Sequence, residues 1–214
     1  MNINRHDFYE RYQKGELKIA LIGMSNVGKS YTATRLAEHY EFSLIEVDKL
    51  IRTDMGHESM KDFAEWQGQP FTNGYAEREE ISIEKETIAT KSAISSKKSN
   101  TLIDTTGSVI YVKENVLEEL VNNFYVVYIQ VHEDHIERLK NDYFSNPKPL
   151  IWNNHYRKIN TKSPIESLFV CYPELLEARR KAYEKIADKI ISSTKILDKK
   201  TDIKELFKLL QPAD

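Results

Sequence analysis

The chain has 214 residues, of which 40% are hydrophobic and 30% are charged, as is typical of a globular protein. The formal net charge of −2 predicts no broad basic surface, so nucleic acid is not an expected partner. There is no membrane-spanning apolar run, no apolar signal-peptide stretch in residues 1–16, and only one cysteine, Cys171, so we expect a cytoplasmic protein without an internal disulfide.

Predicted strands and helices alternate along the chain. We expect strands at 17–22, 42–47, 101–104 and 124–131, and a last one within 189–194. We expect helices after residue 28, at 48–65 with a break near Gly56, at 76–95 with a weak apolar stripe through Ile81, Ile88 and Ala89, around 116–121 and 136–143, from about 173, and at 203–210. This order predicts an α/β fold, with a parallel sheet covered by helices on both faces.

Residues 145–172 lose the helical and strand periodicity and contain Pro147, Pro149 and Pro164. A segment of this length without regular structure is typically a lid or a binding loop. No linker or repeat divides the sequence. We therefore expect residues 1–214 to form a single domain with a lid at approximately 145–172.

A phosphate-binding loop is predicted between the first strand and the helix that follows it. Residues 23–30 read GMSNVGKS and match G-x-x-x-x-G-K-[ST]. Backbone N–H groups of such a loop and the N-terminus of the following helix surround phosphate oxygens, while Lys29 reaches the β- and γ-phosphates and Ser30 ligates Mg²⁺. The predicted nucleotide-binding residues here are Gly23, Ser25, Asn26, Val27, Gly28, Lys29, Ser30 and Tyr31.

Asp104 ends the strand at 101–104 and is a second candidate metal ligand. A carboxylate at a strand end beside the phosphate loop can hold the water shell of Mg²⁺; the alternative is an aspartate that caps a turn. The run Asp-Thr-Thr-Gly also resembles a GTPase motif. However, the corresponding later segment, QVHEDH (130–135), lacks the Asn-Lys-x-Asp that reads guanine.

The whole series of segments resembles the shikimate kinase family of small P-loop phosphotransferases. The resemblance rests on LIGMSNVGKSYTATRLAEHYEFSLIEVDKLI (21–51), GYAEREEISIEKE (74–86), DTTGSV (104–109), FYVVYIQVHEDHIERLK (124–140), KPLIW (148–152) and PELLEARRKAYEKIADKII (173–191). It implies a three-layer P-loop NTPase fold with a five-stranded parallel sheet and a mobile lid. It also implies transfer of the γ-phosphoryl group of ATP, with Mg²⁺, to a hydroxyl of a small anionic molecule.

The resemblance implies roles for individual side chains. Glu46 and Asp48 match an acidic pair whose first member helps hold Mg²⁺ and whose second grips the acceptor hydroxyl, although Asp48 can also be a helix N-cap. Lys148 matches a lid arginine that reaches the phosphates, and we count it, with Lys29 and Asp48, as catalytic. Lys140 matches a residue that packs on adenine. Arg179 matches a residue that holds an anionic acceptor group; the alternative is a surface helix charge.

The acceptor side departs from the family pattern. Ala76 stands where the family has an arginine, and Arg78 lies too far around the helix to replace it. Thr105 and Thr106 replace two glycines, so Thr106 and Gly107 are the expected substrate-binding residues of this turn. Two alternatives therefore stay open: a kinase for another small molecule, such as a sugar acid or nucleoside, or a non-catalytic nucleotide-binding regulator. We expect a monomer or a weak dimer.

Overall fold

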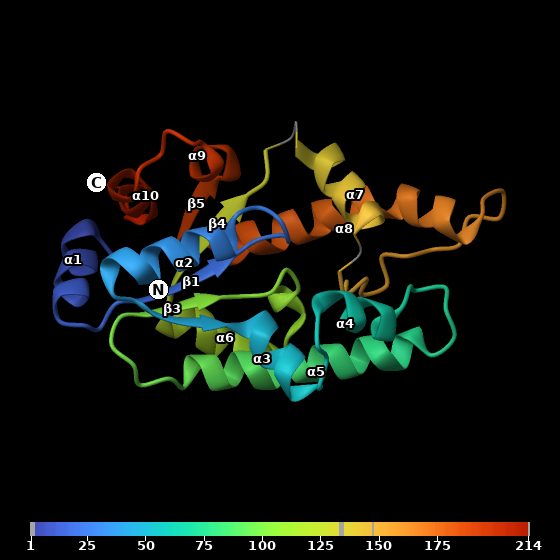
Figure 1. The fold of residues 1–214 in the computed structure, drawn as a ribbon, viewed down its shortest axis with the longest axis horizontal. Coiled ribbons are helices and arrows are strands. Elements are labelled where there is room, and N and C mark those ends of the chain that lie inside the picture. The colour runs from blue at the N-terminus through green and yellow to red at the C-terminus, as the bar shows by residue number, and fades with distance from the viewer. Residues whose placement is uncertain (1–2, 133–134, 147, 214) are drawn as a thin grey trace.

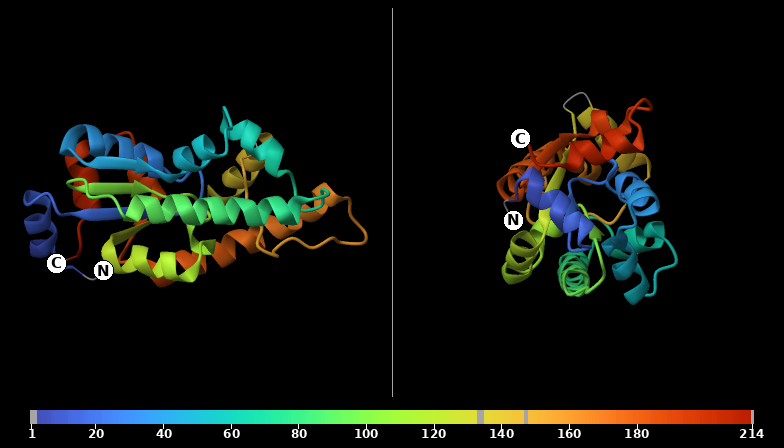
Figure 2. Two further views of the ribbon diagram at one scale, coloured as in Figure 1. Left: turned by 90° about the horizontal axis from the view of Figure 1, so that it is seen from below. Right: turned by 90° about the vertical axis from the view of Figure 1, so that its left-hand side faces the viewer.

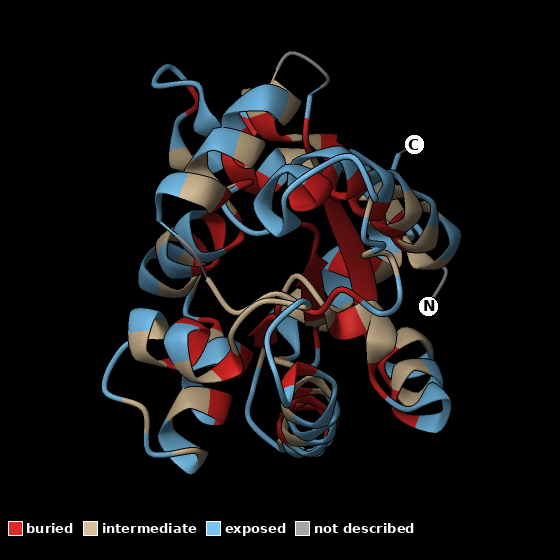
Figure 3. Ribbon diagram, turned by 90° about the vertical axis from the view of Figure 1, so that its right-hand side faces the viewer, coloured by how far each residue is buried: buried red, intermediate tan, exposed pale blue. Residues whose placement is uncertain are grey.

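A computed structural model describes residues 3–132, 135–146 and 148–213 (Figure 1). One five-stranded sheet has the order β2-β3-β1-β4-β5, and every pairing is parallel. The strands are β1 (Lys18–Ile22), β2 (Ser43–Glu46), β3 (Thr101–Asp104), β4 (Tyr125–Gln130) and β5 (Lys189–Ser192). Because parallel sheets are covered on both faces, the central strands are almost entirely apolar and buried, as predicted (Figure 3).

Helices form the two outer layers. α2 and α10 pack together on one face of the sheet, and α5, α6 and α8 lie toward the other (Figure 2). The predicted three-layer α/β fold is confirmed. The helical elements are α1 (Arg5–Gln13), α2 (Lys29–Tyr40), α3 (Val47–Asp54), α4 (Met60–Gln67), α5 (Tyr75–Ile94), η1 (Val109–Tyr111), α6 (Glu114–Asn123), α7 (Ile136–Ser145), α8 (Pro164–Ile186), α9 (Ser193–Leu197) and α10 (Ile203–Leu210). Within the described residues, none of them is long and apolar enough to cross a membrane.

The strand register brings three functional segments to one edge of the sheet. Asp104 at the end of β3 is the register partner of Glu46 on β2 and of Leu21 on β1. The phosphate loop leaves β1 directly beyond this point. In open parallel sheets, ligands bind at the carboxyl edge of the strands, so the register itself places the acidic groups beside the loop.

The expected apolar stripe of α5 is wrong at two of its three positions. Ile81 and Ile88 have exposed fractions of 37% and 54%, whereas Ala89 is buried as expected, together with Ser82, Glu86 and Thr90. α5 packs against α3, α4 and α6, and part of its inward face borders a cavity. Because a cavity wall accepts polar side chains, a periodicity that counts only apolar residues selects the wrong face of this helix.

The expected start of the helix near residue 173 is wrong, because α8 begins at Pro164. Ser163 and Glu166 form a reciprocal capping box, in which the Ser163 N–H donates to the Glu166 carboxylate at 2.7 Å, and Pro164 occupies the first turn. Pro173 lies inside the helix, where it removes one backbone donor. Pro164, which the sequence analysis assigned to the segment without regular structure, thus belongs to the first turn of α8.

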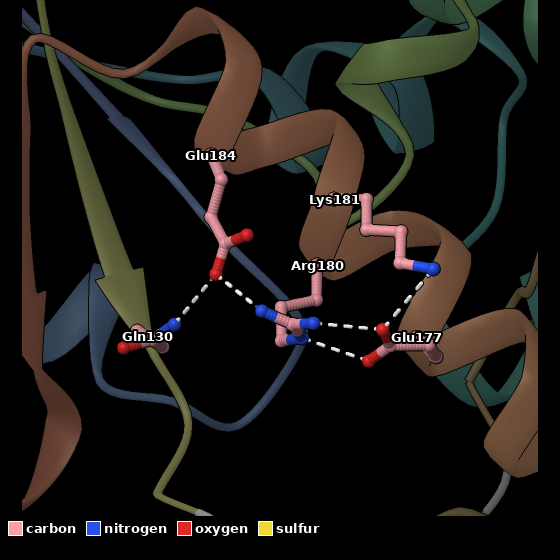
Figure 4. A network of polar contacts seen from close by, with 5 residues as sticks. All are labelled: Gln130, Glu177, Arg180, Lys181 and Glu184. Carbon is pink, nitrogen blue, oxygen red and sulfur yellow. Dashed lines mark hydrogen bonds and ion pairs between the residues drawn. The ribbon is translucent and has the colours of Figure 1, made fainter.

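The outward side of α8 carries a network of charged side chains (Figure 4). Arg180 donates to Glu177 at 2.7 Å and to Glu184 at 2.6 Å, and Lys181 approaches Glu177 at 3.5 Å. Glu184 also accepts a bond of 3.0 Å from Gln130 at the end of β4. The network therefore connects α8 to the strand that it covers.

Candidate active site

The phosphate loop wraps closely around the amine of Lys29. Gly23 has a φ of +140°, and a Cβ at this position would lie 2.6 Å from the carbonyl oxygen of Ile129, so no other residue fits without displacing backbone. The Nζ of Lys29 donates to the carbonyl oxygens of Gly23 at 2.9 Å and Met24 at 2.8 Å. Because α2 begins at Lys29, its N-terminal N–H groups also point toward the loop.

Carboxylates balance the buried Lys29 amine. Burial lowers the pKa of Lys29, while the charges of Asp104 and Asp48 oppose that change. The side chain is therefore a cation placed between a loop built for phosphate and two acids. Such a group can neutralise phosphate charge with little reorganisation.

One cavity of about 570 Å³ joins the phosphate loop to the altered turn after β3. Lys29, Asp48, Lys148 and Arg179 all border it, although they come from α2, α3, the segment before α8 and α8 itself. Gly23 and Val27 are buried behind the loop surface. The predicted site residues that line the cavity are Ser25, Asn26, Gly28, Lys29, Ser30, Tyr31, Asp48, Thr106, Gly107, Lys148 and Arg179.

The proposed metal ligands fit a magnesium ion that also binds phosphate. Oδ1 of Asp104 is buried without a hydrogen-bond partner, and Glu46 lies beside it in the register. Burial raises the pKa of Asp104, opposed by Lys29 and by the Ser30 hydroxyl. In the described parts of the chain, no three Asp, Glu, His or Cys side chains converge on a possible metal position. A small number of protein oxygen ligands suits Mg²⁺, because water molecules and the phosphate oxygens of a substrate usually complete its coordination.

Asp48 projects from the first turn of α3 into the cavity. The residue is exposed to solvent at the cavity wall. The surrounding protein still desolvates the carboxylate, which raises its pKa to about 6 against the opposing charge of Lys29. A carboxylate in this environment can accept a hydrogen bond, or a proton, from a hydroxyl bound in the cavity.

We call residues 148–153 the strap. They lie in the chain segment between α7 and α8, and residues 148–151 line the cavity. Lys148 donates to Oδ1 of Asn26 in the phosphate loop at 2.7 Å. The carbonyl oxygen of Leu150 accepts bonds from Gln67 at 2.6 Å and from the Tyr75 hydroxyl at 2.8 Å. The strap thus contacts the phosphate loop at one end and α4 and α5 in its middle.

Glu79 and Arg179 fix the other end of the strap. The Glu79 carboxylate accepts the backbone N–H groups of Trp152 and Asn153. The buried guanidinium of Arg179 donates to the carbonyl oxygens of Ile151 and Gly107, each at 2.7 Å. Arg179 therefore joins the strap to the turn after β3, and its planar fork suits this double contact.

A family model described as shikimate kinase matches residues 25–211. The chain belongs to the shikimate kinase family. By family and fold it is a kinase. A comparison with curated proteins gave no match.

Solved structures of shikimate kinases share the fold of this family member. The enzyme from Bacteroides thetaiotaomicron gives a TM-score of 0.59 at 18% identity, over 91% of this chain and 94% of that one. The Acinetobacter baumannii enzyme in complex with shikimate gives 0.57 at 20% identity, over 94% and 92%. The Aquifex aeolicus enzyme gives 0.55 at 20%, over 91% and 94%. At these low sequence identities, the similarity supports a shared fold and nothing more specific.

The shikimate kinase pattern drew attention to two basic residues, Lys140 and Arg78, that do not line the cavity. Lys140 packs over the ring of Phe169, 5.6 Å from its centroid, and approaches Glu137 at 3.7 Å. Its contact with adenine stays a prediction. Arg78 donates to the carbonyl oxygens of Gln67 and Asn73 and so holds the loop between α4 and α5. It does not replace the missing arginine at Ala76.

The two threonines that replace family glycines have different surroundings. The Thr105 hydroxyl donates to the carbonyl oxygen of Leu21 at 2.8 Å and so bonds to β1. Thr106 lines the cavity, and its hydroxyl donates to the carboxylate of Glu86. Only Thr106 therefore changes the cavity surface directly.

Sequence reasoning missed four polar residues of the cavity wall: Gln67, Ser82, Glu86 and Ser108. Ser82 donates to Oε1 of Gln67 at 3.1 Å, which connects α5 to α4. A signal was available, because Tyr75, Glu79, Ser82 and Glu86 follow helical spacing and share one face of α5. In an isolated helix, this polar face would be expected to lie toward solvent rather than toward a cavity.

Proposed function

We propose that this protein transfers the γ-phosphoryl group of ATP to a hydroxyl group of a small molecule that carries an anionic group. The observation that carries the proposal is that one cavity is bordered by Lys29 and Lys148, which suit phosphate, and also by Asp48 and Arg179, which suit an acceptor. Phosphate-binding cations and an acid that can bind a hydroxyl line the same cavity. This arrangement suits direct transfer of a phosphoryl group between two bound substrates.

The phosphate end would hold ATP through the loop N–H groups, Lys29 and Lys148. Ser30, Glu46 and Asp104 would hold Mg²⁺, which supplies positive charge to the phosphate oxygens when it is bound. The strap would limit the access of water to the bound substrates, so that the acceptor rather than water receives the phosphoryl group.

The acceptor end would align the attacking oxygen. Asp48 accepts a hydrogen bond from the acceptor hydroxyl and takes its proton as the new P–O bond forms and the bond between the γ-phosphorus and the bridging oxygen of ADP breaks. Arg179, already oriented by the carbonyl oxygens of Gly107 and Ile151, offers positive charge to the anionic group of the acceptor.

The first test is ADP release from Mg-ATP by the purified protein, measured with shikimate and then with hydroxylated acids, sugars and nucleosides. Saturable stimulation by an acceptor, with the phosphorylated product identified by mass spectrometry, supports the proposal. Nucleotide binding without stimulation by any compound contradicts it and supports a regulatory nucleotide-binding role.

Lys29→Ala should abolish transfer, because the cation nearest the transferred group is removed. We expect a loss of at least about a thousandfold in kcat, with an unchanged circular dichroism spectrum. Lys61→Ala, at a largely exposed position on α4, is the matched control and should retain full activity. Transfer at the wild-type rate by Lys29→Ala would remove the assignment of this loop.

A further inference from the structure

The cavity wall contains a second acid besides Asp48, the buried Glu86 on α5. Its exposed fraction is 3%, and it lines the same cavity as Asp48. The Ser108 hydroxyl donates to Oε2 at 2.6 Å, and the Thr106 hydroxyl donates to Oε1. Two hydroxyl donors are arranged to stabilise an ionised carboxylate, but hydroxyl groups leave its charge uncompensated.

No cation of the described residues pairs with Glu86 within ion-pair distance. Arg179, whose charge acts on Glu86, donates instead to the carbonyl oxygens of Gly107 and Ile151. Lys29 and Lys148 donate to oxygen atoms of the phosphate loop rather than to Glu86. The acceptor end thus presents two carboxylates and one guanidinium, and the position of Glu86 lacks a positive partner.

We propose that the acceptor carries a protonated amine in addition to its hydroxyl, and that Glu86 binds this ammonium group. The inference rests on the proposed function and names the chemical class of its acceptor. A buried carboxylate becomes favourable when a cation pairs with it and the remaining lone pairs are hydrogen-bonded, and Thr106 and Ser108 already provide those bonds.

The geometry also accommodates an anionic group on the same acceptor. Arg179 lines the cavity, and its guanidinium donates to the uncharged carbonyl oxygens of Gly107 and Ile151, so its positive charge is available to a ligand carboxylate. A hydroxylated amino acid would place its hydroxyl at Asp48, its amine at Glu86 and its carboxylate at Arg179. A hydroxy acid without an amine would leave Glu86 uncompensated and bring a like charge near it.

Matched pairs of probes test the proposal by binding, independently of turnover. Isothermal titration, with Mg²⁺ and a non-hydrolysable ATP analogue present, compares serine with glycerate and glucosamine with glucose. The amine of at least one pair should bind about tenfold more tightly than its partner, in line with one charge-assisted bond. Glu86→Gln should remove that preference while affinity for the ATP analogue stays unchanged.

Glu84→Gln is the control, because Glu84 lies on the same helix but pairs with Lys113 at an exposed position. It should keep the amine preference. Equal binding within both pairs, or a preference that survives Glu86→Gln, overturns the proposal. Melting temperature and nucleotide affinity of Glu86→Gln establish that the variant is folded.

The outcomes separate this inference from the proposed function. Transfer to shikimate or glycerate without any amine preference retains the kinase and rejects the role of Glu86. An amine preference that depends on Glu86, without phosphoryl transfer to any bound amine, supports the ligand class and rejects the transfer reaction.

Discussion

Burial of Glu86 lowers the stability of the ligand-free protein, and the same residue is the proposed binding group for an amine. Burial raises its pKa to about 7 from the ordinary 4.5, although the hydroxyls of Ser108 and Thr106 oppose the change. The folded protein therefore binds this proton more tightly than the unfolded chain. Below about pH 4.5 both states are protonated and burial of the charge costs nothing; the cost grows as the pH rises toward 7 and is constant above it.

Glu86→Gln should stabilise the ligand-free protein at pH 8. The expected gain in the free energy of unfolding is on the order of 3 kcal/mol, because the charge no longer has to be buried. The gain should shrink as the pH is lowered toward 5, where folded Glu86 is already protonated. Urea denaturation across this pH range measures it, and a gain that does not depend on pH would contradict this account.

Arg179 combines a structural role with its place in the cavity wall. Arg179→Lys keeps the charge but cannot reach the carbonyl oxygens of Gly107 and Ile151 with one planar fork. We expect a loss of about 1–3 kcal/mol in the free energy of unfolding, from a buried carbonyl without its donor, and a raised KM for the acceptor. Arg180→Lys, at the next and more exposed position, should change neither quantity.

The strap is the element whose order depends most on a few contacts. Glu79 accepts the N–H groups of Trp152 and Asn153, so Glu79→Ala should free the Asn153 amide and leave the Trp152 amide with only its longer contact of 3.3 Å to the Tyr75 hydroxyl. Hydrogen–deuterium exchange should become faster in residues 148–153 and stay unchanged in β1 and β4. Glu77→Ala, at an exposed position on the first turn of α5, should leave exchange in the strap as it is.

The network on α8 contrasts with the contacts of the strap. Arg180, Glu177 and Glu184 lie on an accessible helix surface, where solvent and salt weaken ion pairs. Arg180→Ala should therefore change the melting temperature only slightly, and less at high salt than at low salt. A large loss of stability that persists in high salt would show that the link to β4 matters more than its exposure indicates.

At the scale of the whole molecule, the sheet and the phosphate loop could be predicted because their signals are local. Apolar runs mark buried strands, and the loop motif lies between a strand and a helix in this sequence. The start of α8 was missed because Pro164 was counted with the other prolines of the aperiodic segment, whereas the capping box of Ser163 and Glu166 marks it as the first turn of a helix.

The wall of the acceptor site was harder to predict, because it depends on which segments meet in space. Ser82 and Glu86 face the cavity only because α5 packs beside α3 and the turn after β3. Arg179 reaches Gly107 and Ile151, which lie 72 and 28 residues away along the chain. Helical periodicity carries no information about such distant partners.

The placement of the two tryptophans gives this protein an optical reporter of its own. Trp152 is fully buried in the strap, and Trp66 packs against Phe63, whose side chain lines the acceptor end of the cavity. With no other tryptophan in the chain, tryptophan emission comes only from positions near the proposed acceptor site. Occupation of the site should thus be visible as a change in emission wavelength or intensity, without any attached dye.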